Sequence, residues 1–199
     1  MHLPLLFAAV FVGALASSAA ASAQTATGTI TINGSVARKC AVTAGGTGGS
    51  FSDTVSLGEL AGSDGTLLAS LGSTSAASPA FTSSFTLKCT SANMGVSVTA
   101  SPMRNTAGPA APSGYTNTIN IFGRAAIDLV GGGVTPLLVD DSSAAAGATT
   151  DTLGAGNFLA NIANNIRVSA FGFNTSPNTS DLLVSGAYTG TIVVVLTPS

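Results

Sequence analysis

Histidine and tryptophan are almost missing from this chain: it contains no tryptophan and one histidine, His2. Histidine is the commonest general base beside a serine or cysteine nucleophile, and it is also a frequent zinc ligand. Because His2 lies in a segment that we expect to be removed, we expect the mature chain to contain no histidine for either role. We therefore predict that the protein is not an enzyme, with no catalytic residue, no metal site and no cofactor.

Charge is also scarce, since Asp, Glu, Lys and Arg make up 7% of the residues, against roughly 25% in an average soluble domain. The net charge is −2 and the basic residues are scattered. Nucleic acid binding requires a basic stripe, so we predict no nucleic acid partner. Such a chain also has little electrostatic repulsion to keep its copies apart.

Three local features suggest chemistry but have simpler interpretations. The adjacent acids Asp140 and Asp141 lack the spacing of a calcium loop, so we interpret them as a solvated pair at a loop tip. The glycine-rich stretch 45–50 lacks the Lys-Ser/Thr of a phosphate-binding loop, which favours a flexible turn. Tyr115 and Tyr188 are expected at core or corner positions of strands.

The first 23 residues have the layout of a secretory signal peptide. An apolar run extends from Leu3 to Leu15, and small residues follow it up to Ala21-Ser22-Ala23. The run is too short to span a bilayer, and the A-x-A sequence is typical of a cleavage site. We expect residues 1–23 to be removed and the mature chain to begin near Gln24, with a retained anchor as the alternative.

The two cysteines, Cys40 and Cys89, are then exported to a compartment where disulfides persist. Only one intramolecular pairing exists for two cysteines, and it closes a loop of about 50 residues, worth roughly 4 kcal/mol in the chain-entropy model. The alternative is two free thiols.

After Gln24 the chain alternates apolar and polar residues with period two, which is typical of half-buried antiparallel strands. The expected strands are FTSSFTLKC (81–89), MGVSVTA (94–100), YTNTINIFG (115–123) and NIRVSAFGF (165–173). Residues 58–72 hold at most one or two helical turns. The stretches 44–50, 106–114, 131–133 and 142–150 are rich in Gly, Ser and Ala and are predicted to be loops. We therefore predict an all-β fold, a β-sandwich in one domain.

Four stretches, GSVARKCAV, TVSLGEL, FTLKCTSANMGVSV and the C-terminal SGAYTGTIVVVL, resemble in this order the subunits of chaperone–usher pili and the related spore coat protein U-type fimbrial subunits. The resemblance implies an immunoglobulin-like β-sandwich over residues 33–199 that lacks its last strand. It also implies a structural subunit of a bacterial adhesive fimbria, exported through the periplasm to the cell surface. Its partners are then a periplasmic chaperone, an outer-membrane usher and neighbouring subunits, in a homopolymer.

In that family a donor strand fills the gap, first from the chaperone and then from the next subunit. By resemblance, Cys40 and Cys89 match the family disulfide. Ile192, Val194 and Leu196 match the apolar residues of the last strand, which pairs with the chaperone. Residues 24–32 fall where the N-terminal donor strand is expected, with Ala26, Gly28, Ile30 and Ile32 on one face. The first core strand is expected to begin at Gly34-Ser35-Val36.

Two other interpretations remain open for the sequence. Residues 29–39 are one long first strand if the sandwich is complete by itself. Such a protein is a secreted adhesin or binding domain for a ligand such as a carbohydrate or a host surface. It predicts a monomer with an exposed aromatic or acidic site.

Overall fold

The computed structural model of this chain describes residues 29–133, 138–143 and 147–199. It divides into two units, Met1–Ser35 and Val36–Ser199. The described part of the first unit, residues 29–35, contains no helix or strand. The predicted signal peptide lies outside the described residues, as do Ala26 and Gly28.

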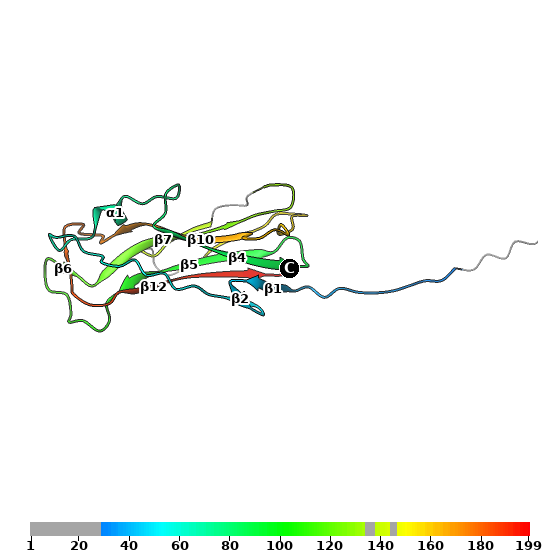
Figure 1. Cartoon of the computed structure of the whole chain (residues 1–199), viewed down its shortest axis with the longest axis horizontal. Coiled ribbons are helices and arrows are strands. Elements are labelled where there is room, and N and C mark those ends of the chain that lie inside the picture. Colours follow the sequence, from blue (N-terminus) through cyan, green and yellow to red (C-terminus); the bar gives the residue numbers. More distant parts are fainter. Residues whose placement is uncertain (1–28, 134–137, 144–146) are drawn as a thin grey trace, which may run out of the picture. The chain divides into compact units, whose positions relative to one another are not determined.

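The second unit is almost entirely strands and loops, as predicted (Figure 1). The one helix among its described residues, α1 (Ala69–Gly72), is a single turn within residues 58–72, where at most one or two turns were expected. The long strands are β4 (Phe81–Cys89), β5 (Gly95–Arg104), β7 (Thr118–Ile127), β10 (Ile166–Asn174) and β12 (Thr189–Thr197). The short ones are β1 (Cys40–Ala44), β2 (Gly46–Thr47), β3 (Ser50–Phe51), β6 (Tyr115–Thr116), β8 (Leu138–Asp141), β9 (Thr149–Thr152) and β11 (Leu182–Leu183).

The main sheet runs β1-β4-β10-β7-β5-β12, with β8 added to β7 and β9 added to β5, all antiparallel. Strand β7 pairs with β5 only through Thr118 and Ile119, and with β10 and β8 farther along its length. It therefore connects a layer of β1, β4, β10 and β8 with a layer of β9, β5 and β12. This arrangement is consistent with a β-sandwich.

Period-two alternation determines which side chains fill the core. In β4, Ser83, Phe85 and Leu87 are buried while Ser84 and Lys88 are exposed. In β5, the alternate residues Val96, Val98 and Ala100 are buried. Two clusters result. The larger contains Val98, Ile127 and Ile166, and the smaller contains Ile119, Ile121 and Phe173.

The start of the first core strand was predicted wrongly. Strand β1 begins at Cys40 rather than at Gly34, and Val36 is 79% exposed. The reason lies in the partner strand, because β4 ends at Cys89 and leaves nothing for residues before Cys40 to pair with. Only Thr90 reaches farther back, where its hydroxyl donates to the Ala37 carbonyl at 2.9 Å.

Two of the expected loops contain short strands. Residues 44–50 include β2 and the start of β3, which form a small hairpin, and β9 begins inside the stretch 142–150. Tyr115 was expected on the buried face but is 43% exposed, because β6 pairs with β11 outside the main sheet. Tyr188 is half-buried, with its hydroxyl 2.9 Å from the Val184 carbonyl oxygen, as expected for a corner residue.

Candidate functional site: an open strand edge

The last strand, β12, has a partner on one side only. Within the described residues it pairs with β5 and with no other strand. Its burial alternates along its whole length: Ile192, Val194 and Leu196 are half-buried, whereas Val193 and Val195 are 51% and 48% exposed. The first three side chains pack against the larger core cluster. These are the residues that the resemblance assigned to the partner-strand edge.

The backbone groups of the same three residues point to the open edge. In an antiparallel pair, the N–H and C=O of one residue point to the same side, and successive residues alternate. The Ala100 N–H donates to the Asp140 carboxylate, away from β12, and Ala100 lies opposite Ile192. Ile192, and by alternation Val194 and Leu196, therefore turn their hydrogen-bonding groups away from β5. A strand added at this edge would bond to them.

The inward side chains of β12 are less covered than those of its neighbours. On β5, Val96 and Val98 are 3% and 0% exposed, and on β10, Ile166 is 0% exposed. No residue of β12 is buried, although Ile192 lies close above Gly123, where an added Cβ would be 3.1 Å from its side chain. Burial of these apolar groups is incomplete because, in the described part of the chain, no second strand pairs with β12 at this edge.

A second unpaired segment contacts the same core. Residues 53–60 follow β3 and belong to no strand. Val55 is 39% exposed, and Leu57 packs against the smaller cluster, which Ile192 also contacts. We name the open edge of β12, with Ile192, Val194 and Leu196, the donor groove. The stretch TVSLGEL carried only the resemblance in the sequence-based prediction, although the alternation of Val55 and Leu57 indicates an extended segment that packs one side against the core.

The described residues of the predicted donor strand are available for contact. Ile30 is 88% exposed and Ile32 is 91% exposed, and residues 29–39 are not in any strand. The single long first strand of the self-complete interpretation is therefore not found.

The predicted disulfide is present between Cys40 of β1 and Cys89 of β4. The two residues lie directly opposite each other in the β1–β4 register. Both are half-buried and pack against the larger core cluster, where Cys40 Sγ lies 3.4 Å from Met94 Sδ. The bridge fixes the start of β1 to the end of β4. It is the only cysteine chemistry available, because neither sulfur is a free thiol.

The acidic pair was placed wrongly at a loop tip. Asp140 is 6% exposed and lies in β8. Its carboxylate accepts from the Ala100 N–H at 2.7 Å and from the Thr149 hydroxyl at 2.9 Å, so it joins β8 to β5 and β9. Asp141 accepts from the N–H and hydroxyl of Ser143. In the part of the chain that the structure describes, no three His, Cys, Asp or Glu residues gather as a metal site.

Asp128 and Tyr188 are among the ionisable groups whose pKa values are shifted by a clear cause. Arg167 on β10 donates to both carboxylate oxygens of Asp128 at 2.7 Å, and these hydrogen bonds lower the pKa of Asp128. Burial raises the pKa of the Tyr188 phenol, against the opposing effect of its hydrogen bond to Val184. Neither group faces a second acid or base in a cavity, so both shifts belong to structural contacts.

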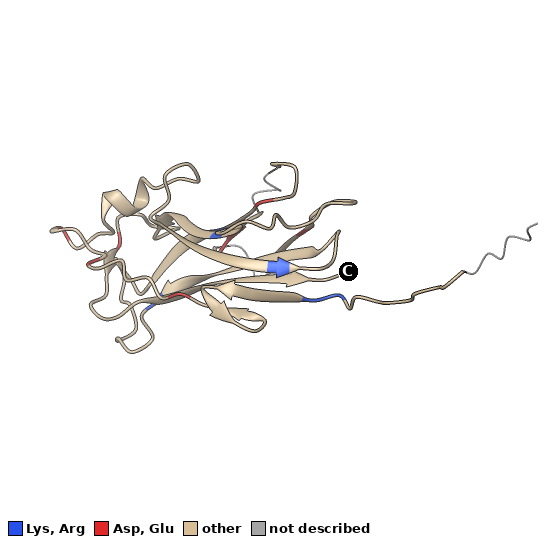
Figure 2. Cartoon of the chain, turned by 45° about the vertical axis from the view of Figure 1, so that its right-hand side comes forward, with Lys and Arg blue, Asp and Glu red and all other residues tan. Residues whose placement is uncertain are grey.

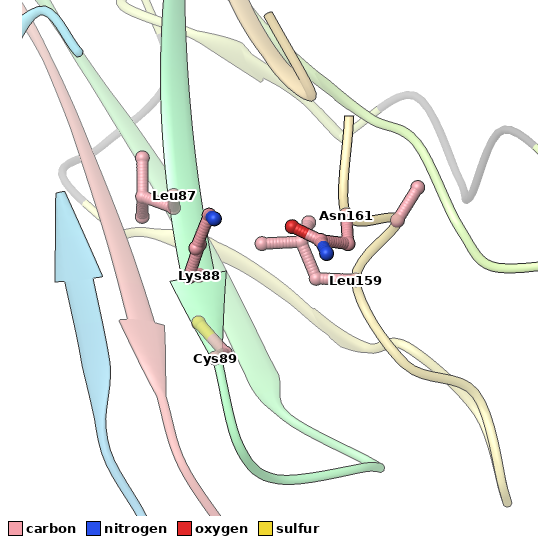
Figure 3. Close-up of a pocket in the computed structure, with 6 residues that line it drawn as sticks. Leu87, Lys88, Cys89, Leu159 and Asn161 are labelled. Atoms are coloured by element: carbon pink, nitrogen blue, oxygen red, sulfur yellow. The ribbon is translucent and has the colours of Figure 1, made fainter. Parts of the chain in front are cut away.

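A shallow depression of about 240 Å³ lies beside the disulfide (Figure 3). Leu87, Lys88 and Cys89 of β4 form one side, and Leu159, Ala160 and Asn161 form the other. Lys88 is the only ionisable side chain among them and is exposed on β4. A lone solvated amine without an acid or base partner offers no catalytic arrangement.

No protein-family model, curated protein or solved structure matches this chain. Within the described residues, no helix has the length and apolar character needed to cross a membrane.

Proposed function

We propose that this protein is a structural subunit of a bacterial surface fimbria, that its fold is an incomplete immunoglobulin-like sandwich of the pilin type, and that it polymerises by donor-strand complementation. The observation that carries the proposal is the open edge of β12, where half-buried apolar side chains and outward-pointing backbone groups belong to the same residues. Natural sheets avoid such edges because they drive association. In this protein, association is the function.

The donor strand comes from the N-terminal segment of another copy, residues 24–32. Its apolar positions recur every second residue, as do Ile192, Val194 and Leu196 on β12. Ile30 and Ile32 enter the groove, and the backbone of the segment bonds to the open edge of β12. A slip of one residue would turn the threonine face inward, so the alternation sets the register.

The free energy of this addition comes from apolar burial and backbone hydrogen bonds. Burying Ile30 and Ile32 contributes roughly 1.5–3 kcal/mol each, and each new backbone hydrogen bond contributes about 1 kcal/mol net. Before assembly, a periplasmic chaperone covers the same edge, and an outer-membrane usher exports the subunit to the surface. Adhesion is then a property of the fibre.

The test is a self-complemented variant, residues 33–199 with the 24–32 peptide fused after Ser199 through a flexible linker. It is expected to be a stable monomer, because its own donor strand fills the groove. Residues 33–199 without the peptide should aggregate or require a chaperone. If this truncated chain is monomeric and as heat-stable as the fusion, the donor-strand proposal is wrong.

A matched pair of substitutions tests which face of the donor strand enters the groove. Ile30→Asp places a charge on the face that enters the groove and should abolish polymerisation. Thr31→Asp places the same charge on the opposite face and should leave polymerisation intact. Chaperone capture should survive in both variants because the groove is unchanged. Equal loss of polymers in both variants contradicts the proposed register.

A further inference from the structure

Serine and threonine dominate one part of the outer surface of the β9–β5–β12 layer, and we name this part the hydroxyl face. On β5 its residues are Ser97, Thr99 and Ser101, which alternate with the buried Val98 and Ala100. The register places Thr191, Val193 and Val195 of β12 opposite them, and Thr150 of β9 opposite Ser97 on the other side. Thr197 and Thr152 continue the two outer strands.

No residue of the hydroxyl face is charged or aromatic. It therefore has no charged group to pair with a phosphate, a carboxylate or an amine, and no ring on which a sugar can stack. Figure 2 shows how few charged residues the whole chain has, and they amount to 7% of it. Each hydroxyl both donates and accepts hydrogen bonds, and Val193 and Val195 add exposed apolar surface, so the face is complementary to itself.

The face is continuous with the edge proposed for assembly. In a donor strand that turns Ile30 and Ile32 inward, Thr29 and Thr31 point outward, because side chains alternate across a strand. These threonines would lie beside the outward residues of β12 and widen the hydroxyl face by one strand. Assembly then enlarges an uncharged surface and repeats it once per subunit.

From this continuity and the absence of charge, we infer that the hydroxyl face binds the same face of a second copy, joining fibres side by side into bundles. The inference rests on the proposed function for the repetition of the face along a fibre. Each contact is weak by itself, but repetition makes the association multivalent. Because the same patch is used on both partners, the contact is isologous.

The test places like charges on both partners. A double variant with Val193→Lys and Val195→Lys changes two exposed side chains. Sheets packed face to face lie about 10 Å apart, which is close to the Debye length at 0.1 M salt. Bundling measured by electron microscopy and low-speed sedimentation should fall roughly tenfold or more at low salt and recover partly at high salt.

The matched control carries the same two charges on the opposite layer. Thr82→Lys and Ser84→Lys alter exposed positions of β4, and this variant should bundle like the parent. A second double variant, Val193→Glu with Val195→Glu, should form mixed bundles when added to fibres of the Val193 and Val195 lysine variant. Unchanged bundling of those lysine fibres, or equal dispersal of the β4 control, overturns the inference.

Cross-linking separates this inference from the proposed function. In the full chain, Val193→Cys should give disulfide-linked dimers on oxidation, whereas Ser84→Cys should not. If Val193→Cys dimers form but fibres do not, the contact between hydroxyl faces stands and donor-strand assembly is wrong. If fibres form but neither bundles nor Val193→Cys dimers are found, the proposed assembly stands and the lateral contact is wrong. Binding of the face to another surface, such as a crystalline polysaccharide, with no dimers also rejects it.

Discussion

At the scale of single residues, buried polar side chains replace strand hydrogen bonds where the ladders end. Asn165, just before β10, is fully buried. Its side-chain amide donates to the Leu87 and Ala160 carbonyls at 2.7 Å and accepts from the Leu87 N–H at 2.9 Å. Asp140 has the same role for Ala100. These two side chains bond to backbone groups of β4 and β5 just beyond the points where their pairing with β10 and β9 ends.

The substitution Asn165→Ala should therefore lower the free energy of unfolding by more than an average substitution does. The Leu87 N–H and two carbonyls lose their partners in a dry environment, with a cost of about 3 kcal/mol in the free energy of unfolding. Urea unfolding of the self-complemented variant measures the difference. The exposed neighbour Asn164 is the control, although its positive φ of 57° makes glycine the suitable replacement. A loss below about 1 kcal/mol for Asn165→Ala contradicts this role.

The Asp128–Arg167 pair predicts a pH dependence with a definite sign. The folded-state pKa of Asp128 is below its ordinary value of 3.8, so the pair stabilises the fold at pH values above that number. Asp128→Asn should lower the free energy of unfolding by about 1 kcal/mol at neutral pH, because the pair is only partly buried. The difference should vanish as the pH falls through the folded-state pKa. A difference that grows in acid contradicts this assignment.

At the scale of elements, the two ends of the main sheet are held differently. Strand β1 is attached to β4 by the disulfide, by its ladder and by contacts of Thr90 with Lys39. Among the described strands, β12 pairs with β5 alone, and its outer edge has no strand partner. The covalent bridge keeps the first strand in place while the other edge remains open to a partner.

Removing the bridge by Cys40→Ala and Cys89→Ala together should destabilise the fold. The bridge spans a sequence separation of 49, and a closed loop of that length is worth about 4 kcal/mol in the chain-entropy model. Chemical unfolding of the self-complemented variant with and without the cysteines measures this. Equal midpoints and slopes for the two proteins contradict a stabilising role.

At the scale of the whole molecule, the scarcity of charge makes assembly depend on apolar burial. The groove side chains Ile192, Val194 and Leu196 and the donor side chains Ile30 and Ile32 are all apolar, and the net charge is −2. Screening by salt acts on charges and has little to act on here. The proposed function as a fibre subunit therefore does not require electrostatic steering.

Donor-strand exchange should accordingly be insensitive to ionic strength. Incubating subunits that carry the free N-terminal segment 24–32, without the C-terminal fusion, at low and at high sodium chloride should give the same yield of polymer, measured by size-exclusion chromatography. Bundling of the Val193 and Val195 lysine variant should change over the same range and is the internal comparison. A polymer yield that falls steeply with salt contradicts this prediction, because it indicates that charged contacts drive assembly.

The sequence by itself determined the strand faces and the bridge. Alternation in FTSSFTLKC predicted β4 from Phe81 to Cys89, with Phe85 and Leu87 inside, because period two depends only on neighbouring residues. The cysteine count, together with the predicted export signal, predicted the Cys40–Cys89 bond, which is present. The sequence also limited residues 58–72 to one or two helical turns, and α1 is a single turn.

Only the tertiary structure decided which strand pairs with which, and hence which edges stay open. An alternating pattern assigns a side chain to a face but names no neighbour, so Val36 and Tyr115 were misplaced where no strand of the main sheet reaches them. Asp140 was read as solvated, yet distant Ala100 and Thr149 give it buried partners. The open edge of β12 has the same origin, because a missing hydrogen-bond partner is a property of long-range pairing.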